Sequence, residues 1–465
     1  MTTRQSGYRR IMRLRGRLAL ASSVPFIALV IAACVGDDPN VTEHVGADGA
    51  APDSTSPIPG PEASTASDAS ADATNAPKVV HIATSAFSSC ALFDDGHVKC
   101  WGSNAFGECA TGSFSSMVLT PALVKGVDDA VAIGGGGNHF CVATKTGTAK
   151  CWGANYYGTL GNGAHADDGG ANAAQPAPVT GVTTAAKVAS TNGATTCVVL
   201  SDNPPAARCW GTDDFFQVGA ASTDSCTGAS GTTSCVIAPA GVQGGLNVDS
   251  IAGGSAHTCV AYGNSAVRCW GLNAGARLGQ TGTDGDGATV TTVPVVVSGY
   301  AADELVAGKS HTCGRRGSGV ACWGTRSFGA TGVGLTDAGT TQGPTAVELP
   351  APGAAKQLSA RAFNTCALLT NGAVACWGSN SHGQLGSKTN VTAGCTTNGS
   401  PVADCRGTPE LVGSLTDATE IAVGNEHACA MRKTGEVVCW GSNNAGQIGD
   451  GNFGISVDAP VAVHL

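Results

Sequence analysis

Residues 364–386 read NTCALLTNGAVACWGSNSHGQLG, with Cys366 and Cys376 on either side of a Thr-Asn-Gly and a Trp-Gly directly after the second cysteine. Cys-Trp-Gly recurs at 100–102, 151–153, 209–211, 269–271, 322–324, 376–378 and 439–441. These seven copies use all seven tryptophans of the chain and are spaced by 51 to 63 residues. A signature at such a spacing is typical of a repeat architecture.

The cysteines of each copy predict a hairpin closed by a disulfide. Three loop residues ending in Gly suit a tight β-hairpin, which places Cys366 opposite Cys376 at a separation that a disulfide can bridge. Zinc would require Cys-x2-Cys knuckles or nearby histidines, so we expect disulfides and neither a metal nor a cofactor. The expected hairpin pairs are Cys90–Cys100, Cys141–Cys151, Cys197–Cys209, Cys259–Cys269, Cys313–Cys322, Cys366–Cys376 and Cys429–Cys439.

Six cysteines lie outside these hairpins. Two further pairs, Cys226–Cys235 and Cys395–Cys405, are expected to close two loops. Cys109 replaces a leucine of the repeat and is interpreted as a buried apolar free thiol; a reactive or partner-bonded thiol is the alternative. The sixth, Cys34, belongs to the N-terminal segment.

The first 33 residues have the layout of a secretory signal. Six arginines and no acidic residue precede a short apolar run that ends in Ile-Ala-Ala-Cys. This ending resembles the bacterial lipobox, which implies cleavage before Cys34 and lipidation of its thiol. An ordinary signal cleaved nearby and a short uncleaved anchor are the alternatives. We expect a protein of the bacterial cell envelope, with Val35 favouring the outer membrane and surface exposure left open.

Composition predicts the remaining organisation. Residues 34–77 are rich in Pro, Ala, Ser and Asp, which indicates a disordered tether, and residues 78–465 form the globular part. The 67 glycines fit many short strands joined by turns. Without the six signal arginines the chain has 19 basic against 34 acidic residues, which argues against binding of nucleic acid through phosphate contacts.

The extended pattern GxxHxCALxxxGxVxCWGxNxxGQLGxG resembles the repeat of the regulator of chromosome condensation family, with NSHGQLG, NNAGQIG and NYYGTLG as close matches. The resemblance covers about residues 78–465 and implies an all-β fold, a seven-bladed β-propeller. Phe216 and Ala276 stand where Gly is expected and Arg326 replaces Asn, so we expect less regular turns in blades three to five. We also predict that residues 458–465 complete the first blade and close the ring.

Histidines and acidic residues offer few candidates for chemistry. His139, His257, His311 and His427 each stand two positions before a hairpin cysteine, and each is expected to bond a neighbouring backbone group. The segment TDGDG at 283–287 hints at calcium but lacks the spaced ligands and distal Glu of a calcium loop. No catalytic motif is present, so no catalytic residue is assigned.

Loop insertions indicate a binding function. They follow the Gly-Gln-Leu-Gly element at 162–176, 220–240, 280–292, 333–344, 387–408 and 450–457. Insertions at the same position of successive repeats lie on the same face of the molecule. We expect a monomeric, membrane-tethered propeller that binds an unidentified protein or glycan through that face, although exposure alone would also explain variable loops. The alternatives are guanine-nucleotide exchange, implied by the family but disfavoured by export, and an unrecognised extracytoplasmic enzyme.

Overall fold

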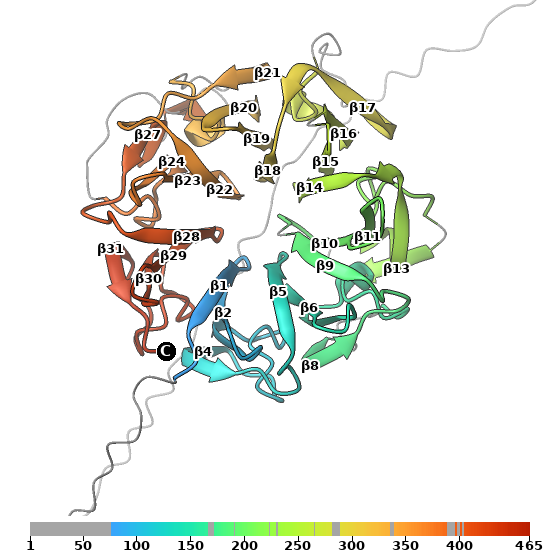
Figure 1. Ribbon diagram of the computed structural model, residues 1–465, viewed down its shortest axis with the longest axis horizontal. Helices are drawn as coiled ribbons and strands as arrows, with labels where there is room; N and C mark the ends of the chain where they lie inside the picture. The colour runs from blue at the N-terminus through green and yellow to red at the C-terminus, as the bar shows by residue number, and fades with distance from the viewer. Residues whose placement is uncertain are drawn as a thin grey trace, which may run out of the picture. The chain divides into compact units, whose positions relative to one another are not determined.

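A computed structural model describes residues 76–465 apart from 166–171, 190, 223, 229–230, 265, 281–288, 335–338, 388–395, 398–399 and 402–403. The strands form seven antiparallel sheets around a central axis, so the chain is an all-β, seven-bladed propeller (Figure 1). The expected signal, Cys34 and most of the tether lie outside the described residues. Within the part described, no helix is long and apolar enough to cross a membrane.

The first four blades follow one another along the chain, each running from an inner to an outer strand. Blade 1 holds β1 (Val79–Thr84), β2 (Ser88–Phe93), β3 (Val98–Ser103) and β4 (Met117–Leu123). Blade 2 holds β5 (Ala130–Gly135), β6 (His139–Thr144), β7 (Ala149–Gly153) and β8 (Ala173–Pro178). Blade 3 holds β9 (Ala185–Ala189), β10 (Thr195–Leu200), β11 (Ala206–Thr212) and β13 (Gly231–Leu246), extended by β12 (Asp224–Gly228). Blade 4 holds β14 (Val248–Gly253), β15 (His257–Tyr262), β16 (Ala266–Leu272) and β17 (Val290–Ala301).

The last three blades repeat the arrangement. Blade 5 holds β18 (Glu304–Ala307), β19 (His311–Arg316), β20 (Gly319–Thr325) and β21 (Thr340–Ala346). Blade 6 holds β22 (Ala355–Arg361), β23 (Asn364–Leu369), β24 (Val374–Ser379) and β27 (Cys405–Leu411), beside a small pair of β25 (Thr396–Thr397) and β26 (Ser400–Pro401). Blade 7 holds β28 (Ala418–Val423), β29 (His427–Arg432), β30 (Val437–Gly441) and β31 (Val457–Ala462). Short 3-10 turns η1 (Tyr156–Gly158), η3 (Ala274–Ala276) and η4 (Ser327–Gly329) follow the third strands of blades 2, 4 and 5.

One disulfide per blade joins the second strand to the third, as expected. All seven pairs have a Cα–Cα distance of 4.1 Å, close to that of directly opposed residues in a non-hydrogen-bonded pair. Closing a loop of this length contributes about 2–3 kcal/mol on the chain-entropy account. Cys226 and Cys235 join β12 to β13, while Cys405 is disulfide-bonded and its expected partner Cys395 lies outside the described residues.

Tryptophans connect each blade to the one before it. Every Trp indole is fully buried and donates its Nε1–H to a backbone carbonyl in the Gly-Gln-Leu-Gly element of the preceding blade. The bonds, of 2.8 to 3.0 Å, run from Trp101 to Gln447, Trp152 to Glu108, Trp210 to Thr159, Trp270 to Gln217, Trp323 to Arg277, Trp377 to Ala330 and Trp440 to Gln384. The repeated Trp therefore fixes the angle between neighbouring blades.

The prediction for ring closure is wrong. The C-terminal strand β31 pairs with β30 and completes blade 7, while blade 1 has its own outer strand β4. Each repeat supplies all four of its strands in order, so the Pro-x-x-Val strand after each loop belongs to the repeat that precedes it. The ring closes through the same side-chain contacts as every other seam, including the Trp101–Gln447 bond.

The prediction of irregular turns in blades three to five holds for blades 4 and 5 and not for blade 3. The turns of blades 4 and 5 have two successive left-handed residues, as does that of blade 2, whereas the turn of blade 3 has one, like those of blades 1, 6 and 7. Phe216 and Ala276 adopt φ values of 60° and 56°, in the left-handed region used by the glycines of the other copies. The N–H groups of Phe216 and Ala276 bond the carbonyls of Asp213 and Asn273 at 3.0 Å, and Gly329 bonds Arg326 likewise at 2.8 Å. Hydrogen bonds keep the turn although the sequence departs from the pattern.

Candidate binding surface

One end of the propeller, here called the loop face, carries the first turn of each blade and the loops that follow Cys-Trp-Gly. The two sets lie together because backbone bonds join them in each blade, for example Ser103 N to Phe87 O and Thr325 N to Ser310 O, both at 2.9 Å. The described parts of the six insertions lie on this face.

Backbone hydrogen bonds link the first turns of neighbouring blades around the centre. Ala86 N donates to Gly137 O at 2.9 Å, Gly137 N to Gly193 O at 2.9 Å, and Asn425 N to Ala86 O at 3.1 Å. These bonds hold the loop face in one shape before any ligand arrives, which reduces the entropy lost on binding.

Arg361 closes the central channel at the loop face. Its side chain is 2% exposed and donates to Thr84 O, Gly135 O, Gly136 O and Val423 O at 2.8 to 3.3 Å, which lie on blades 1, 2 and 7. Burial lowers the pKa of the guanidinium to about 10, so it stays charged at neutral pH. Four carbonyl dipoles, rather than an acid, compensate this charge.

Beyond Arg361, the channel is a cavity of about 440 Å³ lined by the innermost strands. Glu304 accepts hydrogen bonds from Arg315 Nε at 2.8 Å and Leu358 N at 3.2 Å, and Glu420 accepts from Ile82 N at 3.3 Å. Burial raises the pKa of Glu304, opposed by Arg315. These acids satisfy exposed strand edges, and no group of three metal-ligating side chains exists among the described residues.

The four repeated histidines bond hydroxyl groups of the next blade, not backbone groups as predicted. His139 Nε2 lies 2.6 Å from Thr196 Oγ1 and His427 Nε2 lies 2.9 Å from Ser89 Oγ, and His257 and His311 have equivalent threonine partners. All four rings are buried, which lowers their pKa values, to about 3 for His139 and His427. They are neutral structural links between blades.

Aromatic side chains concentrate on the loop face. Of the sixteen Phe and Tyr residues of the chain, two precede residue 76, and ten of the other fourteen lie in loop-face turns and loops. The ten are Phe87, Phe106, Phe114, Tyr156, Tyr157, Phe215, Phe216, Phe328, Phe363 and Phe453. Phe114 and Phe453 are 56% and 58% exposed. Large aromatic surface left in water on one face is typical of an interaction site.

Three of these aromatic residues have a costly backbone conformation. Tyr157, Phe216 and Phe328 have φ values of 62°, 60° and 58°. Bulky side chains rarely adopt this region, and such positions cluster at functional sites. The turn tolerates glycine at both positions, because Gly275 (φ 72°) is equivalent to Tyr157 and Phe328, and Gly383 (φ 74°) is equivalent to Phe216. The rings are therefore not required by the fold.

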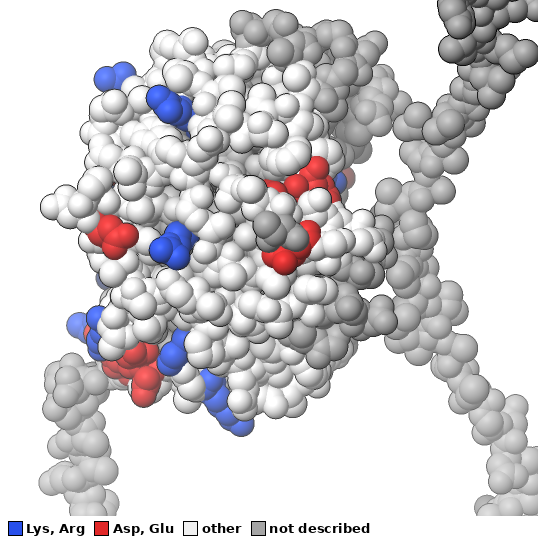
Figure 2. Space-filling view, turned by 90° about the vertical axis from the view of Figure 1, so that its right-hand side faces the viewer, with Lys and Arg blue, Asp and Glu red and all other residues white. Residues whose placement is uncertain are grey.

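Basic side chains have the opposite distribution. Lys309 and Arg326 are the basic side chains that are not buried in the described loops and turns of the loop face, whereas Lys78, Lys125, Lys145, Arg316 and Lys433 lie at the other end. In the side view of Figure 2, the blue atoms gather mainly on the left-hand half. The loop face therefore has few basic side chains, although it carries acids such as Asp214, Glu426 and Asp450. A face rich in aromatic rings suits the core of a protein interface.

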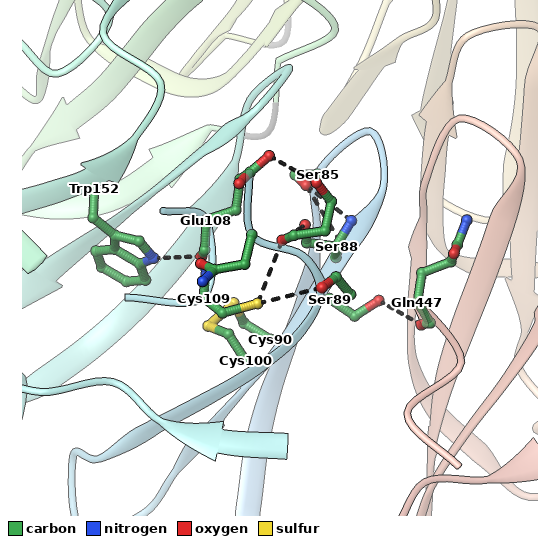
Figure 3. The surroundings of a disulfide bond; sticks show 12 residues. Ser85, Ser88, Ser89, Cys90, Cys100, Glu108, Cys109, Trp152 and Gln447 are labelled. Atoms are coloured by element: carbon green, nitrogen blue, oxygen red, sulfur yellow. Dashed lines mark hydrogen bonds between the residues drawn. A yellow bond between two sulfur atoms is a disulfide. The ribbon is translucent and has the colours of Figure 1, made fainter. Parts of the chain in front are cut away.

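Cys109 is buried beside the first hairpin disulfide (Figure 3). Its Sγ contacts the carbonyl of Ser103 at 3.4 Å. Burial raises the pKa of the thiol, and the neighbouring Glu108 raises it further. The structure therefore places it as an inert packing group.

Sequence reasoning missed two features of this surface. Arg361 gave no signal because its four partners are distant in sequence. The aromatic residues gave a signal that could have been found, because counting Phe and Tyr by repeat phase separates the two faces.

Comparison with known proteins identifies the repeats. The family described as regulator of chromosome condensation (RCC1) repeat matches residues 79–108, 130–159, 355–384, 418–447 and, in a second form, 371–431. The fold is a seven-bladed β-propeller, and its blades 1, 2, 6 and 7 contain stretches similar to regulator of chromosome condensation repeats.

Two curated relatives show how far the likeness extends. The chain is 27% identical over 226 residues to the human probable E3 ubiquitin-protein ligase HERC4, which is 48% of this chain but only 20% of that protein. It is 27% identical over 383 residues to the secretion-regulating guanine nucleotide exchange factor of Bos taurus, covering 76% of this chain and 75% of that protein.

Solved structures share the fold. Prp20p of Saccharomyces cerevisiae, whose structure was described with its binding to Gsp1p and histones, superposes with a TM-score of 0.63 at 18% identity, over 80% of this chain and 87% of that one. Human WBSCR16 superposes with a TM-score of 0.64 at 18% identity, over 79% and 95%. At this identity the likeness shows the architecture alone.

Proposed function

We propose that this chain is an exported, lipid-anchored propeller that binds a protein partner through its loop face. Cys34 carries the lipid, residues 34–77 form the tether, and the loop face provides the contact surface. The observation that carries the proposal is the gathering of ten aromatic residues on one preorganised face.

The architecture supports a binding role. Hydrogen bonds among the first turns fix the positions of the loops, and the disulfide between Cys226 and Cys235 orders one insertion. Exposed rings such as Phe114 and Phe453 supply apolar area at low entropic cost, because an aromatic side chain has only two rotatable bonds. Rigid loops and aromatic anchors are what tight protein interfaces use.

A capture experiment tests the loop face. The mature chain, starting after the signal, is immobilised and exposed to envelope proteins alongside a variant carrying Phe114→Ser and Phe453→Ser. The matched control carries Leu123→Ser and Leu411→Ser, which remove exposed apolar side chains from the outer strands. We expect a specific protein to be lost by the loop-face variant and kept by the control. Equal capture by all three would refute the proposal.

Metabolic labelling with palmitate tests the anchor. Wild type is expected to incorporate label and Cys34→Ala is expected to lose it and to leave the membrane fraction. A label that persists in Cys34→Ala would refute Cys34 as the site of lipid attachment.

Nucleotide exchange is a second candidate, favoured by the likeness to the bovine exchange factor. Export separates the chain from cytosolic GTPases, so we expect no acceleration of GDP release from a small GTPase by the purified chain. A large acceleration in a fluorescent-GDP assay would favour exchange over the binding proposal.

A further inference from the structure

A pocket of about 260 Å³ opens on the loop face at the seam between blades 2 and 3. Gly137, Asn138 and His139 line one side, Tyr156 and Tyr157 another, and Ala194 the third. At the equivalent seam between blades 5 and 6, Phe363 takes the place of Ala194 and its ring packs on Phe328 at 4.8 Å. The small residue in blade 3 therefore leaves open a space that another seam fills.

The hydrogen bonds of His139 define an acceptor at the pocket. The hydroxyl of Thr196 donates to Thr159 O at 2.9 Å, so it must accept the bond from His139 Nε2 at 2.6 Å. In the neutral ring Nε2 then carries the proton and Nδ1 carries a lone pair. In His257, His311 and His427 the Nδ1 atom is buried without a partner. His139, although only 2% exposed, lies at the wall of an open pocket.

Two more polar groups at the pocket are uncommitted. The side-chain amide of Asn138 and the hydroxyl of Tyr156 make no hydrogen bond to any described residue, and both side chains are partly exposed. The ring of Tyr156 is held edge-on against Phe106 at 5.4 Å. The pocket thus combines an acceptor, an amide and a hydroxyl with aromatic walls.

The lining excludes charged ligands. None of the lining side chains is ionised at neutral pH, since burial and the nearby Arg361 lower the pKa of His139 to about 3. A ligand with a formal charge would lose its hydration without a partner of opposite sign. A purely apolar ligand would leave the His139 acceptor and the Asn138 amide unpaired.

We propose that this pocket binds a neutral pyranose, such as a terminal sugar of a glycan. One sugar hydroxyl donates to His139 Nδ1, a second pairs with the Asn138 amide, and a third pairs with the Tyr156 hydroxyl. The apolar C–H face lies against the tyrosine rings. The proposal rests on the use of the loop face for binding and adds a ligand class to it.

Saturation-transfer NMR on the mature chain tests the proposal, with glucose, galactose, mannose and N-acetylglucosamine each added alone. We expect saturable binding of at least one sugar, unchanged from about pH 5 to about pH 8 because Nδ1 stays unprotonated. Asn138→Ala and Tyr156→Phe should each weaken it about tenfold, the effect of one lost hydrogen bond. Phe328→Ala, on the equivalent turn of blade 5, is the matched control and should leave affinity unchanged.

Two results would overturn the sugar assignment. The first is no saturable transfer to any of the four sugars. The second is equal binding by wild type and Asn138→Ala. If a Ser- and Tyr-containing peptide binds instead and is lost in Asn138→Ala, the pocket takes a protein side chain. Protein capture that persists without sugar binding would leave the loop-face function standing and remove this inference alone.

Discussion

Arg361 joins four of the seven blades through hydrogen bonds from a single side chain. It extends from β22 across the channel to carbonyls of blades 1, 2 and 7. A buried guanidinium is costly unless each N–H has an acceptor, and here the carbonyl ends of the inner strands provide them. Arg361 therefore links the inner strands of four blades at the loop-face end of the ring.

Replacing Arg361 by Met should lower the free energy of unfolding by about 3 kcal/mol or more, because several buried carbonyls lose their donors. Arg361→Lys is the control, since it keeps the charge and loses the planar fork. Its loss should be smaller but measurable by urea denaturation. Unfolding curves for Arg361→Met that superimpose on wild type would contradict this role.

Cys109 provides a second test at this scale. Its buried thiol, with a raised pKa, should react with Ellman's reagent only after the chain unfolds in denaturant without reductant. In a chain that starts at residue 35 and so lacks Cys34, about one thiol per chain should then appear, and Cys109→Ala should abolish it. Several reactive thiols in the unreduced protein would show that hairpin disulfides are missing.

Strands and turns of neighbouring blades meet through the repeated Trp and His side chains. The Trp indole and the hydroxyl partner of the His converge on one carbonyl, as Trp210 and Thr196 do on Thr159 O at 2.8 and 2.9 Å. Sequence periodicity predicts that such residues recur, but it does not reveal partners about fifty residues away. For this reason the sequence predicts backbone partners for the histidines, whereas the structure shows hydroxyl partners.

Stability should fall in acid because the buried histidines are neutral in the folded chain. Their folded pKa values are lowered, so the stabilisation is present above pH 6.5 and is lost as pH falls toward about 3 or 4. Each histidine should contribute about 1.4 kcal/mol per pH unit within that window.

The variant His427→Gln isolates this effect, because glutamine keeps an N–H donor for Ser89 and does not titrate. In the difference in unfolding free energy between wild type and variant, the pH-dependent contributions of the carboxylates cancel. They include Asp213, because burial raises its pKa to about 6. The difference should change by about 1.4 kcal/mol per pH unit between pH 6 and pH 4. A difference independent of pH would refute the assignment.

For the whole molecule, the sequence predicts the number of blades and the hairpin disulfides, because both are local and repeat with Cys-Trp-Gly. Closure was wrong for a physical reason: the pattern shows that β31 resembles β4 and β27 but not which neighbour it pairs with. The sequence predicts the binding face only from the position that the loop insertions share within the repeat. Its aromatic content and the pocket beside Asn138 depend on residues from different blades meeting in space.

The central claim is that the loop face, and not the opposite face, meets the partner. Site-specific photo-crosslinking in intact cells tests this most directly, with the reactive amino acid placed at Phe114 on the loop face or at Leu123 on the outer strand. The account predicts a discrete protein adduct from position 114 and none from position 123. Protein adducts from position 123 alone would contradict it.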